Sequence, residues 1–168
     1  MANVLSGQSG FGSPNVPLTS SRHTELLGSG GLADGCVDCH MAPPPSGGIA
    51  GGHNWQLEWD DHGTIKEHMT GCYTSGCHTS SSLTNFNYKN CQTEITTLAD
   101  NVKSRLMSAG LIDANNYVLT TRWYKQKELQ AIWNYKMVLM DRSNGVHNTA
   151  YSRSLLNAAL DLVPAPPA

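Results

Sequence analysis

The sequence has little net charge, few aromatic residues and no long apolar run. Its 168 residues include 11 Lys and Arg against 13 Asp and Glu, a formal net charge of −2. Without an excess of basic charge, a nucleic-acid-binding protein is not expected. No apolar stretch approaches the roughly 20 residues needed to cross a bilayer, so we expect no membrane span. Large apolar side chains are scarce before residue 90, and we expect something besides their packing to hold that part together.

The composition changes at about residue 90. Residues 1–90 are rich in Gly, Ser, Pro, His and Cys and show no sustained period of 2 or 3.6. Residues 91–168 are rich in helix formers. We therefore predict a mainly α fold in one domain, 1–168, with an irregular, ligand-supplying N-terminal half, two or three C-terminal helices and almost no sheet.

Apolar spacing predicts the helices at 93–109, 122–142 and 149–162, with Gly110 as a left-handed C-cap of the first and the second stopping at Gly145. The stripe of the first helix is Ile95, Leu98, Val102 and Leu106. That of the second is Leu129, Trp133, Lys136 or Met137, and Met140; that of the third is Leu155, Leu156, Ala159 and Leu160. For four large side chains a place in the core is expected over one at an interface: Trp123, Trp133, Tyr135 and Met137.

The most informative residues are Cys36-Val37-Asp38-Cys39-His40. A C-x-x-C-H run is the attachment signature of c-type heme. Two thiols add to the two vinyl groups on one edge of the porphyrin, and the following imidazole then lies beneath the ring, facing the iron. This spacing predicts a covalently bound heme with His40 as an iron ligand.

A second run extends from Cys72 to His78, with four residues between Cys72 and Cys77 instead of two. The terminal Cys-His pair is kept, and Gly76 allows the longer loop to fold so that both thiols still reach the vinyl groups. We therefore predict two heme c groups per chain. Residues 1–90 would supply the heme-wrapping part of a diheme cytochrome c domain, and residues 91–168 its helical part.

The main alternative is a four-cysteine zinc site made of Cys36, Cys39, Cys72 and Cys77. Zinc would not need His40 or His78, and a disulfide framework explains neither histidine. Cys91, the fifth cysteine, is left alone by the spacing. A buried free thiol is the simplest interpretation of it; an intersubunit disulfide and a third thioether are the alternatives.

Five histidines remain beyond the two motifs: His23, His53, His62, His68 and His147. Two six-coordinate hemes need two more ligands, so the supply favours bis-histidine, low-spin irons. Such irons have no open position for a substrate. For His62 and His68, beside acidic residues, a solvated or hydrogen-bonded side chain is the favoured interpretation. Methionine ligation by Met41 or Met69 is a less favoured alternative.

The chain resembles, from about residue 20 to 162, the C-terminal part of pentaheme cytochrome c nitrite reductases and related multiheme cytochromes. The matching pieces are residues 36–41, Gly52-His53-Asn54-Trp55, the second cysteine motif, and 122–148 from Arg122-Trp123 to Gly145-Val146-His147-Asn148. Their order and approximate spacing agree. The family's last motif has two residues between its cysteines, whereas this one has four.

The resemblance implies pairs of iron ligands. His147 would pair with His40 on the first heme, and His23 with His78 on the second. The histidine corresponding to His53 ligates an earlier heme, for which this chain has no motif. His53 would therefore reach a heme of another chain or of a missing N-terminal segment, or have lost that role. Long C-terminal helices form subunit contacts in that family, so the resemblance also implies a homo-oligomer or a filament with inter-subunit heme contact.

The family's catalytic heme is held by a C-x-x-C-K run, which this sequence does not contain. Nitrite reduction by this chain alone is therefore not expected. The predicted function is electron transfer between redox partner proteins; the alternative is a heme enzyme or small-ligand sensor with one open iron. Because heme is attached outside the cytoplasm, we predict a periplasmic or extracellular protein. Residues 1–12 do not read as a secretory signal, so we expect that signal to lie outside this sequence.

Overall fold

The computed structural model describes residues 2–28, 32–45 and 49–165. These residues form two compact units: the helical unit, Met1–Thr24 with Asn90–Ala168, and the cysteine unit, Glu25–Lys89. The prediction of a mainly α fold is confirmed, since the sheet found in the described residues is one two-stranded hairpin. No helix in the described ranges is long and apolar enough to cross a membrane.

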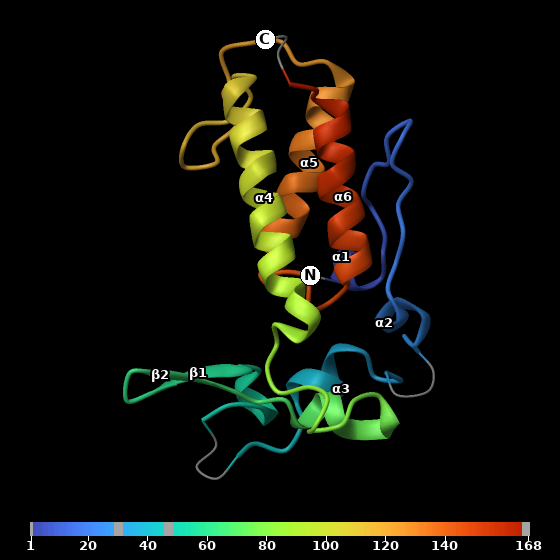
Figure 1. Ribbon diagram of the computed structural model, residues 1–168, viewed down its shortest axis with the longest axis vertical. Coiled ribbons are helices and arrows are strands. Elements are labelled where there is room, and N and C mark those ends of the chain that lie inside the picture. The colour runs from blue at the N-terminus through green and yellow to red at the C-terminus, as the bar shows by residue number, and fades with distance from the viewer. Residues whose placement is uncertain (1, 29–31, 46–48, 166–168) are drawn as a thin grey trace. The chain divides into compact units, whose positions relative to one another are not determined.

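Three long helices make up most of the helical unit: α4 (Cys91–Ser108), α5 (Gln126–Asp141) and α6 (Thr149–Leu162). They lie side by side, and α6 contacts both others (Figure 1). The short helix α1 (Ala2–Leu5) belongs to the same unit, and α2 (Arg22–Glu25) lies at the boundary. The predicted bounds agree closely for α4 and α6, whereas α5 begins four residues later than predicted.

The end of α4 is set by Gly110. The backbone of Gly110 is left-handed, with φ of 65°. The N–H of Gly110 donates to Met107 O at 2.9 Å, and that of Leu111 donates to Leu106 O at 2.9 Å. These two bonds form a Schellman motif, which satisfies carbonyls that the helix itself leaves unpaired. The prediction of Gly110 as a left-handed C-cap is confirmed.

The core of the helical unit confirms two of the three predicted apolar stripes. On α4, Ile95, Val102 and Leu106 are buried, and on α6 so are Leu155 and Leu156. The stripe of α5 lies on the solvent side instead: Leu129 and Trp133 are 50% exposed and Met140 is 72% exposed. The buried face of α5 consists of Ala131, Ile132, Asn134, Tyr135, Val138 and Asp141.

The prediction that Trp123 and Trp133 belong to the core is therefore wrong, since Trp123 is 97% exposed. The buried and the exposed sets on α5 both repeat at helical spacing, so periodicity alone does not tell which set faces the protein. Tyr135 is buried, and Met137 packs against the core, as expected.

An extended N-terminal segment runs beside the helices and is held by their polar side chains. Gly10 N–H donates to Tyr151 Oη at 2.8 Å, and Phe11 exchanges two hydrogen bonds with the buried side chain of Asn134. The indole of Trp133 donates to Ser9 O at 2.7 Å. Polar groups at otherwise apolar positions thus fix a segment that has no secondary structure of its own.

The cysteine unit is built from short elements. They are α3 (Cys36–His40), the 3-10 helices η1 (Gly52–Asn54) and η2 (Thr70–Gly76), and the strands β1 (Glu58–Asp61) and β2 (Thr64–Glu67). The strands pair antiparallel with Glu58 opposite Glu67 and Asp61 opposite Thr64. A further 3-10 helix, η3 (Tyr88–Asn90), precedes α4. The irregular structure expected before residue 90 is found in this unit.

Candidate heme-attachment and iron-ligand residues

The first cysteine motif is the short helix α3. Gly35 precedes it with φ of 58°, and Met41 N–H closes its last turn on Val37 O at 2.9 Å. Residues at i, i+3 and i+4 share one face of a helix, so Cys36, Cys39 and His40 share one face of α3. This is the arrangement that attachment of one porphyrin edge above one imidazole requires.

The second motif lies in and directly after η2, with Cys72 in the helix and Cys77 and His78 beyond its end. Tyr73 anchors η2 by donating its hydroxyl proton to Leu83 O at 2.8 Å. The ring of His78 stands edge-on to that of Tyr88, with 5.5 Å between the centroids. The longer spacing is therefore accommodated by a 3-10 helix instead of the α-helical turn of the first motif.

The two motifs pack directly against each other at Gly71. A Cβ atom at Gly71 would lie 2.6 Å from Cys39 O and 2.7 Å from Asp38 O, so only glycine allows this approach. Burial raises the pKa of the Cys72 thiol to about 11, with further contributions from Cys39 and Cys77. Burial, Asp38, Cys36 and Cys77 likewise raise the pKa of Cys39. The four predicted attachment thiols thus lie close enough to influence one another.

His40 is oriented by Trp55. The Nδ1 atom of His40 lies 2.9 Å from Trp55 O, and the two rings stack with centroids 5.7 Å apart and an interplanar angle of 21°. Trp55 presents its carbonyl from a left-handed backbone, φ 61°, at the end of η1. The Gly52–Trp55 stretch therefore meets the first motif through Trp55.

His147 is oriented by a buried carboxylate. Its Nδ1 atom lies 2.8 Å from Asp141 Oδ1, and the Asp141 side chain is 1% exposed. Ser143 donates its hydroxyl proton to the other oxygen of Asp141 and accepts the backbone N–H of His147 at 3.2 Å. The turn between α5 and α6 thus fixes the ring of His147, which is itself 21% exposed.

His23 lies beside His147 in the helical unit. Its Nδ1 atom is 3.2 Å from the backbone oxygen of His147. The neighbouring residue Asn148 holds the two segments together: its side chain accepts the N–H of Ser21 at 2.8 Å and donates to Thr24 Oγ1 at 2.7 Å. Asn148 also caps α6 by accepting the N–H of Tyr151. Two predicted ligands are therefore placed by one buried asparagine.

His40, His23 and His147 share one feature, which is an oxygen acceptor at Nδ1. A carbonyl or carboxylate oxygen only accepts, so Nδ1 carries the proton and Nε2 of the neutral ring carries the lone pair. Metal-ligating histidines in proteins show this arrangement, because the second hydrogen bond fixes the ring and its tautomer. These three residues therefore fit the role of iron ligands through Nε2.

The other histidines differ. His53 is exposed in η1. The His62 side chain is 98% exposed and pairs with Asp61 at 3.0 Å, which confirms the solvated interpretation. His68 is not solvated: it is 5% exposed, its Nδ1 lies 3.5 Å from Thr70 Oγ1, and its Nε2 has no hydrogen-bond partner in the part of the chain that the structure describes. The close approach of its ring requires glycine at position 51.

All five cysteines are free thiols. Within residues 2–28, 32–45 and 49–165, no three His, Cys, Asp or Glu side chains form a group that could hold a metal ion by themselves. Cys91 begins α4 as a partly buried thiol, and burial raises its pKa against hydrogen bonds that lower it.

Sequence reasoning missed the residues that orient the ligands. Trp55 and Asn148 belong to stretches singled out by the resemblance, but nothing in those stretches shows their roles. Asp141 lies at the end of a predicted helix, where an acidic residue reads as a solvated side chain. The spacing of six residues from Asp141 to His147 becomes informative only once the turn between α5 and α6 is known.

No protein-family model, curated protein or solved structure matches the chain.

Proposed function

We propose that this protein transfers electrons through two covalently attached c-type hemes with bis-histidine, low-spin irons. The observation that carries the proposal is the pairing of two Cys…Cys-His runs with histidines whose Nδ1 atoms bond to oxygen acceptors. The first is the spacing that heme attachment uses, and the second places the lone pair of the neutral ring on Nε2, the atom that would bind iron. The resemblance to multiheme cytochromes supports the same function.

Each group of residues has a distinct role in the proposal. Cys36 and Cys39 would hold one heme, and Cys72 and Cys77 the other, with His40 and His78 as the ligands next to the attachment points. His147 and His23 would be the opposite ligands; which iron each serves stays a prediction from the resemblance. When bound, a c-type heme supplies a one-electron iron couple. The chain sets its potential through ligands, hydrogen bonds and access of solvent.

The packing of the two motifs at Gly71 also supports a relay. Because α3 and η2 touch, the two attachment points of the cysteine unit are adjacent. Residues of that unit would wrap the hemes and replace the apolar core that its sequence does not provide. Export to the periplasm or the cell surface, where heme is attached, is part of the proposal.

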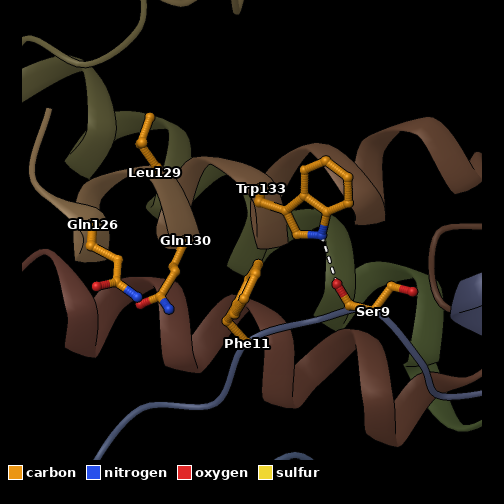
Figure 2. Close-up of a pocket in the computed structure, with 6 residues that line it drawn as sticks. All are labelled: Ser9, Phe11, Gln126, Leu129, Gln130 and Trp133. Atoms are coloured by element: carbon orange, nitrogen blue, oxygen red, sulfur yellow. Dashed lines mark hydrogen bonds between the residues drawn. The ribbon is translucent and has the colours of Figure 1, made fainter.

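We further propose assembly with a second copy of the chain. Leu129 and Trp133 on the exposed side of α5 line, with Phe11, a shallow apolar groove of about 350 Å³, drawn in Figure 2 with the glutamines beside them. Such a patch is typical of interfaces. The exposed His53 is suited to reach a heme of another chain. Trp133→Glu should lower the sedimentation mass from that of the assembled wild type. An equal mass for the two proteins would show that this face is not the interface.

Paired cysteine substitutions test the attachment. The protein is exported in a host with the c-type heme attachment apparatus, and heme per chain is measured by mass and by hemochrome absorbance. Cys36→Ala/Cys39→Ala and Cys72→Ala/Cys77→Ala should each retain one heme, against two in the wild type. Zinc at one ion per chain without heme would refute the proposal, and binding of carbon monoxide or nitrite by the wild type would favour a heme enzyme or sensor.

A further inference from the structure

The carboxylate of Asp141 is a charged group that the proposed function does not yet use. It lies at the end of α5 with its side chain 1% exposed. Its hydrogen-bond partners are the hydroxyl of Ser143 and the ring of His147. Among the residues that the structure describes, no lysine or arginine pairs with it. Burying a carboxylate without an opposite charge is costly, so a positive charge nearby is expected.

If His147 binds iron, the iron would supply positive charge near the carboxylate of Asp141. The Nδ1 proton of His147 points to Asp141, so Nε2 faces away from the carboxylate. A ferric iron on Nε2 would place its charge one imidazole ring away from Asp141. The buried carboxylate and the oxidised iron would then stabilise each other through the ring.

The other oriented histidines bond through Nδ1 to backbone carbonyl oxygens. His40 bonds to the carbonyl of Trp55, and His23 bonds to the carbonyl of His147, at 2.9 and 3.2 Å. A hydrogen bond to an ionised acceptor is about twice as strong as one to a neutral acceptor. It draws the Nδ1 proton away from the ring and makes Nε2 a stronger electron donor, which favours the ferric over the ferrous iron.

We propose, on the basis of the proposed function, that Asp141 is a positioning residue that lowers the reduction potential of the iron bound by His147. The effect would act on the heme that His147 ligates, so it would change one of the two potentials in the relay.

The turn supports this role by fixing the position of the carboxylate. Ser143 donates to the second oxygen of Asp141, which leaves the first oxygen for His147. Ser143 also accepts the backbone N–H of His147, so the His147 backbone and the carboxylate are held by the same hydroxyl. Gly145, with φ of 95°, packs against Ile95 and closes the turn.

The test is a spectroelectrochemical redox titration of the exported diheme protein. Asp141→Asn keeps the size of the side chain and an oxygen that accepts the Nδ1 proton, but removes the charge. One of the two potentials should become more positive while the other, the heme count and the low-spin spectrum stay the same. The matched control is Asp61→Asn, which removes a carboxylate from the exposed His62 and should leave both potentials unchanged.

Ser143→Ala gives an independent test with Asp141 in place. Loss of the hydroxyl donor makes the carboxylate a stronger acceptor for His147, so the same potential should become more negative. If Asp141→Asn does not accumulate with heme, the redox titration of Ser143→Ala alone tests the proposal. Unchanged potentials in a protein that holds two low-spin hemes would overturn the role of Asp141 and leave the electron carrier intact, whereas absence of heme in the wild type would refute the carrier itself.

Discussion

At the scale of single residues, burial separates the histidines that have an oxygen acceptor at Nδ1 into two kinds. Carbonyl or carboxylate acceptors fix His40, His23 and His147, whereas His62 pairs with Asp61 in solvent. The proposal that the cysteines attach heme rests on their spacing alone, because the chemistry of two adjacent vinyl groups is local. The partners of the histidines could not be predicted from the sequence, because Trp55 and Asp141 are brought to them by turns that have no sequence signature.

The burial of the Cys72 thiol predicts slow alkylation. Because the pKa of Cys72 is raised to about 11, roughly one thiol in a thousand is ionised at pH 8, and only the thiolate reacts. In heme-free protein, iodoacetamide should modify Cys72 slowly at pH 8 and about tenfold faster for each pH unit up to 10. Mass spectrometry of the Cys72 peptide measures the rate. The same peptide in urea is the control, and equal rates in both states would contradict the prediction.

Asn148 is predicted to be the most sensitive polar residue of the helical unit. It is fully buried and bonds to Ser21, Thr24 and Tyr151. Replacement by alanine leaves several buried groups unpaired, so Asn148→Ala should lower the free energy of unfolding by about 3 kcal/mol. Urea unfolding followed by circular dichroism measures the change.

The exposed Asn15, which donates to Asp161, provides the control. Asn15→Ala should change the free energy of unfolding by about 0.5 kcal/mol or less. Equal effects of the two substitutions would show that Asn148 does not anchor the N-terminal segment.

At the scale of elements, the bounds of the helices could be predicted better than the faces that the helices bury. The bounds of α6 and the Schellman end of α4 follow from apolar spacing and from Gly110. The buried face of α5 does not follow, because its exposed stripe carries Leu129, Trp133 and Met140 and is as apolar as the buried one. Only the packing of α6 and of the N-terminal segment on Asn134 selects the face.

The contact between α3 and η2 predicts that Gly71→Ala is damaging. The new Cβ would lie 2.6 Å from Cys39 O, so the backbone of one motif must move. Heme per chain in the exported protein should fall below two. Gly12→Ala is the control, since its Cβ would approach no atom closer than 3.4 Å. Full heme loading of Gly71→Ala would show that the motifs are not required to touch.

The ion pair between α4 and α6 predicts a pH dependence. Arg153 donates two hydrogen bonds to Glu94 and lowers the pKa of this carboxyl below its ordinary value of 4.5. A lowered folded-state pKa stabilises the protein above the ordinary value, and this contribution is lost as the pH falls through the folded-state pKa. Because both side chains are more than 40% exposed, the contribution at pH 7 should stay below about 1 kcal/mol.

Urea unfolding of the wild type and of Glu94→Gln at pH 7 and pH 3 measures this contribution. The difference between the two proteins should be present at pH 7 and should shrink as the pH falls toward 3 and Glu94 takes up a proton. A difference of the same size at both pH values would mean that the pair contributes through packing alone.

At the scale of the whole molecule, the chain consists of two units that differ in what stabilises them. The helical unit has an apolar core of three helices, as composition predicts for residues after 90. Residues 2–24 also belong to it, which no local pattern showed, because their hydrogen bonds reach positions more than 120 residues away. The cysteine unit has short elements and few buried apolar side chains, so we expect bound heme to stabilise it strongly.

The central claim is that this chain holds two low-spin c-type hemes, and an absorption spectrum tests it most directly. The purified, exported protein is recorded oxidised and then reduced with dithionite, with heme normalised to protein. We predict sharp reduced bands, two hemes per chain, and no change on adding carbon monoxide or nitrite. A protein without heme that contains zinc, or a high-spin component that shifts with either ligand, would contradict the account.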